Sequence, residues 1–399
     1  LRLARARVRL ARFDLVGARA DAEAALAAGA GVEGLEVAGW VAYYGRDHDA
    51  ARRYADEGVA RAADPALRAS CLALAGRHRH ARGELAGAES CLVEATAGPA
   101  PVRPVAQIWL GALRAHQGRP DEAGDLVGRG LVDPGAIGHP FAPLHGLFVR
   151  CHAAGIAGRL DLAFRAASDL AAEVARQSQQ ASRFRPVVQN LRAWLLRATG
   201  QWSAADDASA EALELGAAID FGEPGAHAVL DLADGRLRAG DDDGAARWLT
   251  QASDMTADDQ ATMVWHQRQR LAWLRGRLAL AAGDPATAAA EAAGLVTDAR
   301  SRGTRRYELL GRALAALAGD GTDHEAIEAL LGELDRVAAP EAWWVTAELA
   351  AARDVDRWRS AAERRASVLV SAATGIPGID ADAVGRALRA ELDRAGRPR

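Results

Sequence analysis

The sequence predicts an all-α fold, a right-handed superhelical solenoid of about eight to nine antiparallel helix hairpins. Two observations carry this prediction. Roughly a quarter of the 399 residues are alanine and only 5% are aromatic, a composition that favours helices over a β-sandwich. In addition, short turn segments containing glycine recur every 39 residues or so, a spacing of about one pair of helices.

The turn segments share a glycine that is followed five residues later by an alanine. The glycines are Gly45, Gly83, Gly118, Gly158, Gly200, Gly240, Gly283 and Gly321. A left-handed glycine commonly ends a helix, and Asp, Ser or Thr just after it can cap the next one. Pro120 and Pro285 follow two of these glycines, where a first helical turn tolerates the missing N–H. Each unit is therefore predicted to be helix–turn–helix.

Small residues occupy the two positions where the helices of one hairpin would cross. The residue seven positions before the glycine is Ala, Gly or Cys in the first seven units, and the residue five positions after it is always alanine. Two helices approach to about 8 Å only where the facing side chains are small. The pattern predicts close contact within each hairpin, for example between Gly111 and Ala123.

This motif resembles the tetratricopeptide repeat (TPR) superfamily, in which a small residue, a turn glycine, an alanine and a later Ala-Leu pair recur. The unit with Leu110-Gly111, Gly118, Ala123 and Gly130-Leu131 follows that pattern. The resemblance covers about residues 1–350, although the family period is shorter, about 34 residues. More loosely, the long degenerate repeats are similar to the MalT-type helical arrays of bacterial signal-transduction ATPases and LuxR-type transcription regulators.

The repeat array is predicted to span residues 1–350, followed by a C-terminal helical capping segment over 351–399. Residues 1–30 are expected to form a truncated first unit. Because the chain starts at Leu1 inside a helical pattern, we expect it to be part of a longer polypeptide. After Pro340 the pattern changes, and helices are predicted over 341–352, 355–372 and 380–395.

Positions that face the inside of the superhelix are estimated from their distance to the turn glycine, because each first helix turns one stripe inward. In the middle units these positions are rich in Arg, His and Trp, which bind partners by bidentate hydrogen bonds and stacking. The predicted concave binding residues are His145, Phe148, His152, Asn190, Trp194, Arg197, His227, Asp234, Arg238, Arg270, Trp273 and Arg277, and the earlier units add Tyr43, Arg77, His80 and His116. Alternatively, the aromatic rings pack between neighbouring repeats and the arginines only solvate a surface.

Several classes of function are disfavoured by what the chain lacks. All 49 basic residues are arginine, so the lysines of P-loops, Schiff bases and kinases are absent. The net charge of −4 argues against a nucleic-acid surface, and no segment has the length and apolar character of a membrane span. His324-Glu325 lacks the second histidine of a zincin motif, and Asp241-Asp242-Asp243 is interpreted as a helix start. No catalytic residue, metal site or cofactor is predicted.

Cysteine and tryptophan suggest two further expectations. Cys71, Cys91 and Cys151 are odd in number and lack metal-ligand spacing, so we expect reduced, buried thiols in a cytoplasmic protein. The adjacent pair Trp343-Trp344 is a candidate for an exposed docking patch, but adjacent tryptophans usually place one ring in a core, so we expect one of the two to be buried.

The sequence-based function is a non-catalytic scaffold that binds a protein or peptide partner, or a small effector molecule, in its concave groove, without contacting nucleic acid or membrane. Its resemblance to MalT-type arrays implies the regulatory region of a larger bacterial transcription regulator or signalling ATPase. Two alternatives stay open: an accessory substrate-binding helical domain of an enzyme, with Arg270, Arg277, His227 and Asp234 in its pocket, and a purely structural spacer.

Overall fold

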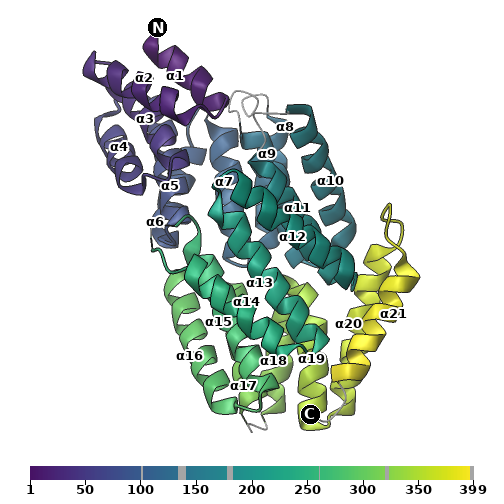
Figure 1. Ribbon diagram of the computed structural model, residues 1–399. Helices are drawn as coiled ribbons and strands as arrows, with labels where there is room; N and C mark the ends of the chain where they lie inside the picture. Colours follow the sequence, from purple (N-terminus) through teal and green to yellow (C-terminus); the bar gives the residue numbers. More distant parts are fainter. Residues whose placement is uncertain (100–101, 134–140, 178–182, 260, 320–322, 396–399) are drawn as a thin grey trace.

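The computed structural model describes residues 1–399 except 100–101, 134–140, 178–182, 260, 320–322 and 396–399 (Figure 1). Regular secondary structure in the described part of the chain is helical throughout, as predicted. The helices are α1 (Arg2–Ala11), α2 (Leu15–Ala27), α3 (Gly31–Tyr44), α4 (His48–Arg61), α5 (Pro65–Ala81), α6 (Leu85–Thr96), α7 (Arg103–His116), α8 (Pro120–Val132), α9 (Ala142–Ile156), α10 (Leu160–Gln177), α11 (Phe184–Ala198), α12 (Trp202–Ala218), α13 (Gly222–Ala239), α14 (Asp242–Met255), α15 (Val264–Ala281), α16 (Pro285–Arg302), α17 (Arg305–Ala318), α18 (His324–Val337), α19 (Ala339–Arg353), α20 (Asp356–Ala373) and α21 (Ala381–Ala395). None of the described helices is both long and apolar enough to cross a membrane.

Consecutive helices pack as antiparallel hairpins, from α1 with α2 to α19 with α20, and α21 packs on α20 and α19 (Figure 1). The predicted close approach within a hairpin is confirmed at Gly111. A Cβ atom added to this glycine would lie 3.1 Å from the carbonyl oxygen of Ala123 and 2.7 Å from Cγ2 of Val127. The alanine five residues after the turn glycine is buried in every unit from Gly45 to Gly283, whereas Ala326 is exposed.

The described turns follow the predicted chemistry except at one glycine, and the predicted turn glycine Gly321 lies outside the described residues. Gly83, Gly118, Gly158, Gly200, Gly240 and Gly283 have φ angles between 71° and 77°. The same prediction was wrong for Gly45, whose φ is −80°, because Arg46 takes the left-handed conformation at φ 63°. The left-handed residue directly precedes the N-cap of the second helix, here Asp47, and Gly45 lies one position too early for that role.

The predicted capping interactions are present where an aspartate follows the turn. Asp241 accepts a hydrogen bond from the backbone N–H of Gly244 at 2.8 Å and caps α14, which confirms the helix-start interpretation of its acidic run. His324 is the first residue of α18, capped by Asp323 in the same way. These side chains satisfy N–H groups that would otherwise lack a partner at the helix start.

The predicted boundary between residues 350 and 351 falls inside α19, so the hairpin of α19 and α20 spans it. The repeat pattern was lost here because Asp354, with φ 53°, takes the left-handed position that glycine holds in other units. At the other end, residues 1–30 form a hairpin with a short first helix, and Phe13 (φ 61°) takes the left-handed position there. The predicted helices after Pro340 agree with α19, α20 and α21 within two residues at each end.

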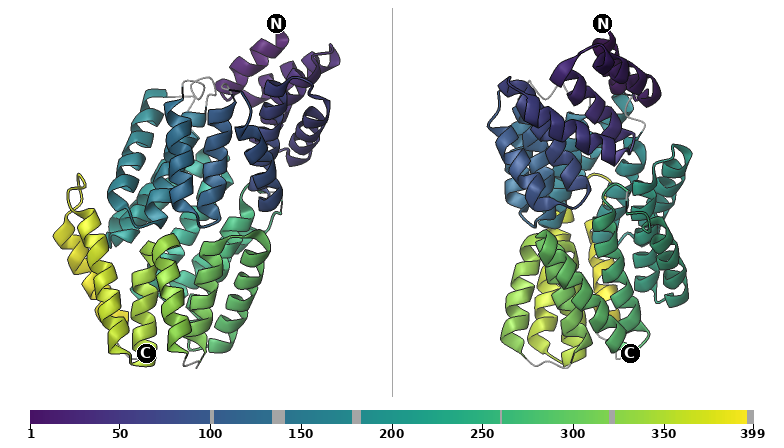
Figure 2. Two further views of the ribbon diagram at one scale, coloured as in Figure 1. Left: turned by 180° about the vertical axis from the view of Figure 1, so that it is seen from behind. Right: turned by 90° about the vertical axis from the view of Figure 1, so that its left-hand side faces the viewer.

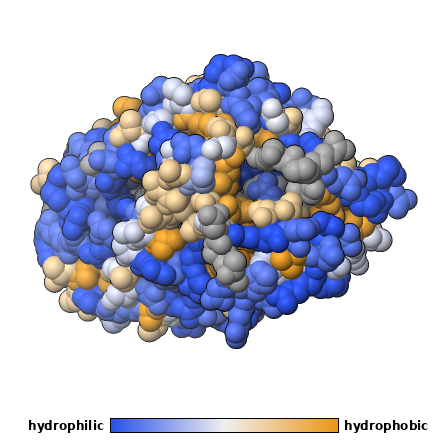
Figure 3. All heavy atoms as spheres, turned by 90° about the horizontal axis from the view of Figure 1, so that it is seen from below, coloured by the Kyte–Doolittle hydropathy of each residue, from blue (hydrophilic) through white to orange (hydrophobic). Residues whose placement is uncertain are grey.

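The array coils back on itself, so that α15–α19 lie beneath α3–α9 (Figures 1 and 2). The turn glycines of the first half form part of this contact. A Cβ atom added to Gly83, Gly118, Gly158 or Gly200 would lie within 2.9 Å of Arg302, Arg305, Ala339 or Ala387, respectively. The backbone N–H of Met263 also donates to the carbonyl of Ala81 at 3.0 Å. Seen from below, the surface of the coil is mainly hydrophilic, with hydrophobic residues gathered near its middle (Figure 3).

Candidate binding cavity

A central cavity of about 280 Å³ lies inside the coil. Its described lining residues come from the first helix of each hairpin or from a loop beside that helix, and none of them belongs to a second helix. Hairpins two to ten contribute, among others, Tyr43 (α3), Arg77 (α5), Trp109 (α7), His152 (α9), Trp194 (α11), Asp231 (α13), Trp273 (α15), Tyr307 (α17) and Trp344 (α19). The inner helices of the solenoid therefore build one continuous wall.

The twelve predicted concave residues, from His145 to Arg277, all line this cavity, and so do the earlier Tyr43, Arg77, His80 and His116. The offsets from the turn glycine therefore identify inward-facing positions. Whether any of these side chains binds a partner stays a prediction.

The aromatic members of this set also pack between repeats, as the alternative interpretation expected. The ring of Trp194 lies against Gly155 of the preceding hairpin, and Trp273 contacts Trp344 edge to face with ring centres 6.2 Å apart. The expectation that only one ring of Trp343-Trp344 is buried was wrong, because both are buried, at 1% and 5% exposure. Both rings belong to the main core and border the cavity, where the guanidinium groups of Arg277 and Arg238 lie over the ring of Trp344.

Sequence reasoning missed a further turn of the inward stripe. The residues seventeen positions before the turn glycine are Phe141, Arg183, Glu223 and His266, and each lines the cavity. Because residues four apart share one face of a helix, extending the stripe one turn beyond the position thirteen before the glycine would have found them. Asp231 and Trp109, both nine positions before a turn glycine, lie within the stripe at a position that the chosen offsets omitted.

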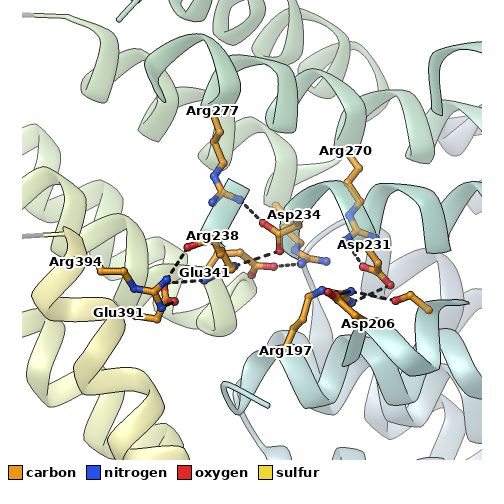
Figure 4. Close-up of polar contacts among 12 residues, drawn as sticks. Arg197, Asp206, Asp231, Asp234, Arg238, Arg270, Arg277, Glu341, Glu391 and Arg394 are labelled. Atoms are coloured by element: carbon orange, nitrogen blue, oxygen red, sulfur yellow. Dashed lines mark hydrogen bonds and ion pairs between the residues drawn. The ribbon is translucent and has the colours of Figure 1, made fainter. Parts of the chain in front are cut away.

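Asp231 is an acidic centre of the cavity wall and is 1% exposed (Figure 4). Arg197 Nη1 from α11 lies 3.3 Å from its Oδ2, and Arg270 from α15 donates a hydrogen bond to its Oδ1. Arg197 also donates to Ser209 Oγ at 3.0 Å. Burial lowers the pKa of Arg270, but the charge and hydrogen bond of Asp231, together with the charges of Tyr307 and Asp234, outweigh burial and raise the pKa. Three inner helices are thus joined by one buried carboxylate.

A second buried carboxylate, Asp234, lies three residues further along α13 (Figure 4). It pairs with Arg238 Nε at 3.3 Å and with Arg277. Burial acts to raise the pKa of Asp234, but the two guanidinium groups outweigh it and hold this pKa well below its ordinary value. The Arg277 guanidinium also lies 4.0 Å from the ring centre of Trp344. These arginines are therefore neutralised within the chain, neither solvated nor unpaired.

The network extends from the cavity wall to the last helix. Arg238 Nη1 lies 4.0 Å from Glu391 Oε2 of α21, and Arg394 pairs with the same carboxylate (Figure 4). Arg394 Nη1 in turn donates to the carbonyl of Arg238 at 2.8 Å. Burial raises the pKa of Glu391, while both arginines oppose that shift. Charged groups hold α21 against the inner helix α13.

Five histidines of the lining form a connected group: His80, His116, His152, His227 and His266. Ring centres lie 5.0 Å apart for His80–His116 and His116–His266, 5.3 Å for His116–His152 and 5.4 Å for His227–His266. Burial lowers the pKa of each, to about 4 for His116 and His227, so the rings are neutral at pH 7. Within the described residues, no three His, Cys, Asp or Glu side chains are placed to hold a metal ion.

Aromatic rings hold two arginines at the other end of the lining. Arg77 Cζ lies 4.7 Å from the ring centre of Trp109 and 5.4 Å from that of Tyr43. Arg183 Cζ lies 4.5 Å and 4.2 Å from the ring centres of Phe13 and Phe221. The hydrogen-bond partners are His80 Nδ1 for Arg77, at 3.3 Å, and the Tyr44 carbonyl for Arg183, at 3.4 Å.

Glu223 is the carboxylate whose charge acts on both of these arginines. Burial raises the pKa of Glu223 to about 7, although Arg77 and Arg183 act to lower it. Tyr43 lies within the field of the same groups: burial raises its pKa to about 12, the arginines oppose that shift and Glu223 adds to it. Burial also lowers the pKa of Arg183. At this end of the cavity, Arg77 and Arg183 thus lie near one carboxylate whose pKa is raised into the neutral range.

Comparison with known proteins agrees with the architecture. No protein-family model and no curated protein matches the chain. Among solved structures, a Rap protein complexed with competence and sporulation factor is similar, with a TM-score of 0.61 and 12% identity over 91% of this chain and 99% of that chain. The P58(IPK) TPR domain aligns over 91% of this chain and 97% of that chain at 14% identity, with a TM-score of 0.23. The chain thus shares its fold, a superhelical solenoid of helix hairpins, with the Rap protein.

Proposed function

We propose that this protein is a non-catalytic binding scaffold whose central cavity holds a segment of a protein or peptide partner, or a small effector molecule. One observation carries the proposal: successive first helices and the loops beside them turn His, Arg and aromatic side chains toward the cavity, and these types make up most of its described lining. Burying polar groups is costly unless they gain partners. An interior of convergent polar groups among aromatic surfaces is typical of ligand sites.

The structural comparison supports binding as the use of this fold. The similar Rap protein forms a complex with competence and sporulation factor, so a coil of this shape takes a partner in at least one protein. The match covers nearly the whole of both chains. We propose the same general role, an interaction scaffold, for this chain.

The charge pairing favours a scaffold over an accessory domain of an enzyme. An accessory domain would use Arg270, Arg277 and Asp234 to hold a substrate, but Arg270 is engaged by Asp231 and the other two pair with each other. Groups already paired stabilise the wall and leave recognition to the aromatic end and the histidines. No nucleophile with a base and an orienting group is recognised among them.

We further propose that the scaffold is the regulatory region of a larger cytoplasmic regulator in a bacterium, of the kind that its MalT-like repeats resemble. The three free cysteines support a reducing compartment. Sequencing the gene upstream is the direct test: a Walker-type loop encoded there supports the regulator, and an unrelated enzyme there contradicts it.

The cavity is tested by filling it. Val187 lines the cavity from α11, and Val187→Trp would occupy its volume without breaking an ion pair. Binders of wild-type protein are selected from a library of random short peptides, and their affinities for the variant are then measured by calorimetry. We expect at least tenfold weaker binding to the variant, about 1.4 kcal/mol.

The matched control is Val93→Trp on α6, where the valine is 46% exposed and outside the cavity. It should bind the selected peptides as tightly as wild type. Circular dichroism of both variants checks that the helices are retained. Equal affinity of the two variants for every selected peptide would place binding elsewhere and contradict the proposal.

A further inference from the structure

We infer that the end of the cavity formed by Arg77 and Arg183 is a subsite for the carboxylate group of a ligand whose remaining part is aromatic or apolar. This rests on the proposed function, because it names the chemical class that the cavity takes. Planar guanidinium groups bind carboxylates through two parallel hydrogen bonds, which gives both energy and orientation.

Charge balance distinguishes this end from the rest of the lining. Elsewhere the arginines face carboxylates of the chain: Arg197 and Arg270 face Asp231, Arg238 and Arg277 face Asp234, and Arg306 pairs with Glu341. Arg77 and Arg183 instead contact rings, an imidazole nitrogen and a carbonyl oxygen. The carboxylate of this end, Glu223, forms no ion pair with either arginine, so both lack the direct carboxylate contact that the other arginines make.

Unmet hydrogen-bonding capacity points to the same group. Arg77 is 9% exposed, and its Nε has no hydrogen-bond partner in the described structure. The buried hydroxyl of Tyr44 has no hydrogen-bond partner there either. Burial raises the pKa of Tyr44, and the charges of Arg77 and Arg183 oppose that rise, because this hydroxyl lies in the field of both cations. Buried donors without acceptors are costly, and carboxylate oxygens are acceptors only.

The rings around the arginines supply the rest of the site. Trp109 and Tyr43 cover Arg77, while Phe13 and Phe221 lie on Arg183. Stacking of this kind occupies the faces of a guanidinium group and leaves the N–H groups along its edge for an acceptor. The same aromatic surfaces offer apolar contact to the body of the ligand.

Glu223 competes with the ligand for the two cations. Its carboxylate lines the cavity, and its charge acts on Arg77 and Arg183 without an ion pair to either. Removing that charge with Glu223→Gln should therefore strengthen carboxylate binding. This gives a variant that gains affinity, a result that general damage to the fold does not produce.

The experiment is isothermal titration calorimetry of the full chain with matched acid and amide probes. Phenylacetate is compared with phenylacetamide, and the dipeptide Gly-Phe with its C-terminal amide, so that a free small acid is distinguished from a peptide terminus. We expect at least one acid to bind tenfold or more tightly than its amide, about 1.4 kcal/mol. Arg77→Gln and Arg183→Gln should each abolish that preference, while Glu223→Gln should enlarge it.

The control is Arg165→Gln, an exposed arginine of α10 that pairs with Asp161 on the outside, and it should keep the preference. Thermal melting checks that each variant is folded. If only one of the two arginine variants folds, that variant alone is enough to test the inference. Equal affinities for acid and amide, an unchanged preference in a folded Arg77→Gln protein, or no binding of either acid at millimolar concentration overturns the inference. The failure of this inference is distinguishable from the failure of the proposed function. If the acid preference is absent, but a neutral ligand binds the Arg77→Gln protein and does not bind the Val187→Trp protein, the cavity keeps its proposed role and only the carboxylate subsite fails.

Discussion

The indole N–H of Trp265 donates a hydrogen bond to the carbonyl oxygen of His80 at 3.0 Å, across 185 residues of sequence. The bond joins the start of α15 to the end of α5, where the second half of the coil meets the first. His80 belongs to the histidine group, and its ring centre lies 6.2 Å from that of Trp265. The contact that closes the coil therefore lies beside the cavity, whose wall includes His80.

Replacing Trp265 by Phe is expected to lower the free energy of unfolding by about 1–2 kcal/mol, because one buried hydrogen bond and some ring contact are lost. The His80 carbonyl keeps its bond from Gly83, so the loss stays moderate. Urea denaturation measures it. Trp248→Phe on the outer helix α14 is the control, and a cost as large as that of Trp265→Phe would show that the inter-turn bond contributes nothing.

Gly118 and Gly283 have nearly the same left-handed backbone, with φ 75° and 72°. A Cβ atom at Gly118 would lie 2.9 Å from the Cβ of Arg305, whereas nothing lies within 4 Å at Gly283. In both alanine variants the free energy of unfolding should fall by about 1–2 kcal/mol, because a residue with a Cβ atom is strained in the left-handed conformation. Gly118→Ala should lose more, and the difference, measured by chemical denaturation, isolates the contact between the two halves. If the two variants lost the same free energy of unfolding, the contact between Gly118 and Arg305 would adjust to the added methyl group without destabilising the fold.

Asp231→Asn is expected to destabilise the fold by about 3–5 kcal/mol, because Arg197 and Arg270 would lose their shared buried counter-charge. The comparison is Asp161→Asn, because Asp161 Oδ2 lies 3.1 Å from Nη2 of Arg165 in an ion pair on the exposed surface. That change should cost less than about 1 kcal/mol. Thermal and urea unfolding of both variants measures the contrast. If both variants lost a similarly small free energy of unfolding, the ion pairs of Asp231 would contribute no more than a solvent-exposed pair.

Acid should destabilise the fold between pH 6.5 and 4 through the histidine group. The pKa of His116 and of His227 is about 4 in the folded state, below the ordinary value of 6.5, so the unfolded state binds more protons in this window. Stability is thus full above pH 6.5 and falls as the pH falls, by up to about 1.4 kcal/mol per unit for each histidine. Urea unfolding at pH 7, 6 and 5 measures this pH dependence of the free energy of unfolding.

Two variants separate the contributions to this pH profile. His116→Gln should flatten it, since one group with a lowered pKa is gone. Glu223 acts with the opposite sign, because its raised pKa of about 7 makes the folded state the one that gains a proton below neutrality. Glu223→Gln should therefore steepen the loss of stability in acid. Parallel profiles for wild type and both variants would contradict these assignments.

Much of the architecture was predictable because it is encoded locally. Helical periodicity repeats every 3.6 residues, so counting back from a turn glycine such as Gly240 correctly identified His227, Asp234 and Arg238 as inward-facing. The crossing of Gly111 with Ala123 follows from side-chain size alone. Where the left-handed residue carries a side chain, as at Arg46 and Asp354, the local signal is absent and the prediction failed.

The sequence by itself therefore determined the hairpins, their small-residue contacts and the inward stripe of each first helix. Only the tertiary structure decided that the coil returns far enough to bring Trp265 to His80 and Arg302 to Gly83. That return is the sum of small rotations between successive hairpins, and no single turn or helix contains it. The pairing of Asp231 with arginines of two neighbouring helices, and the lack of such a partner for Arg77, depend on that accumulated geometry.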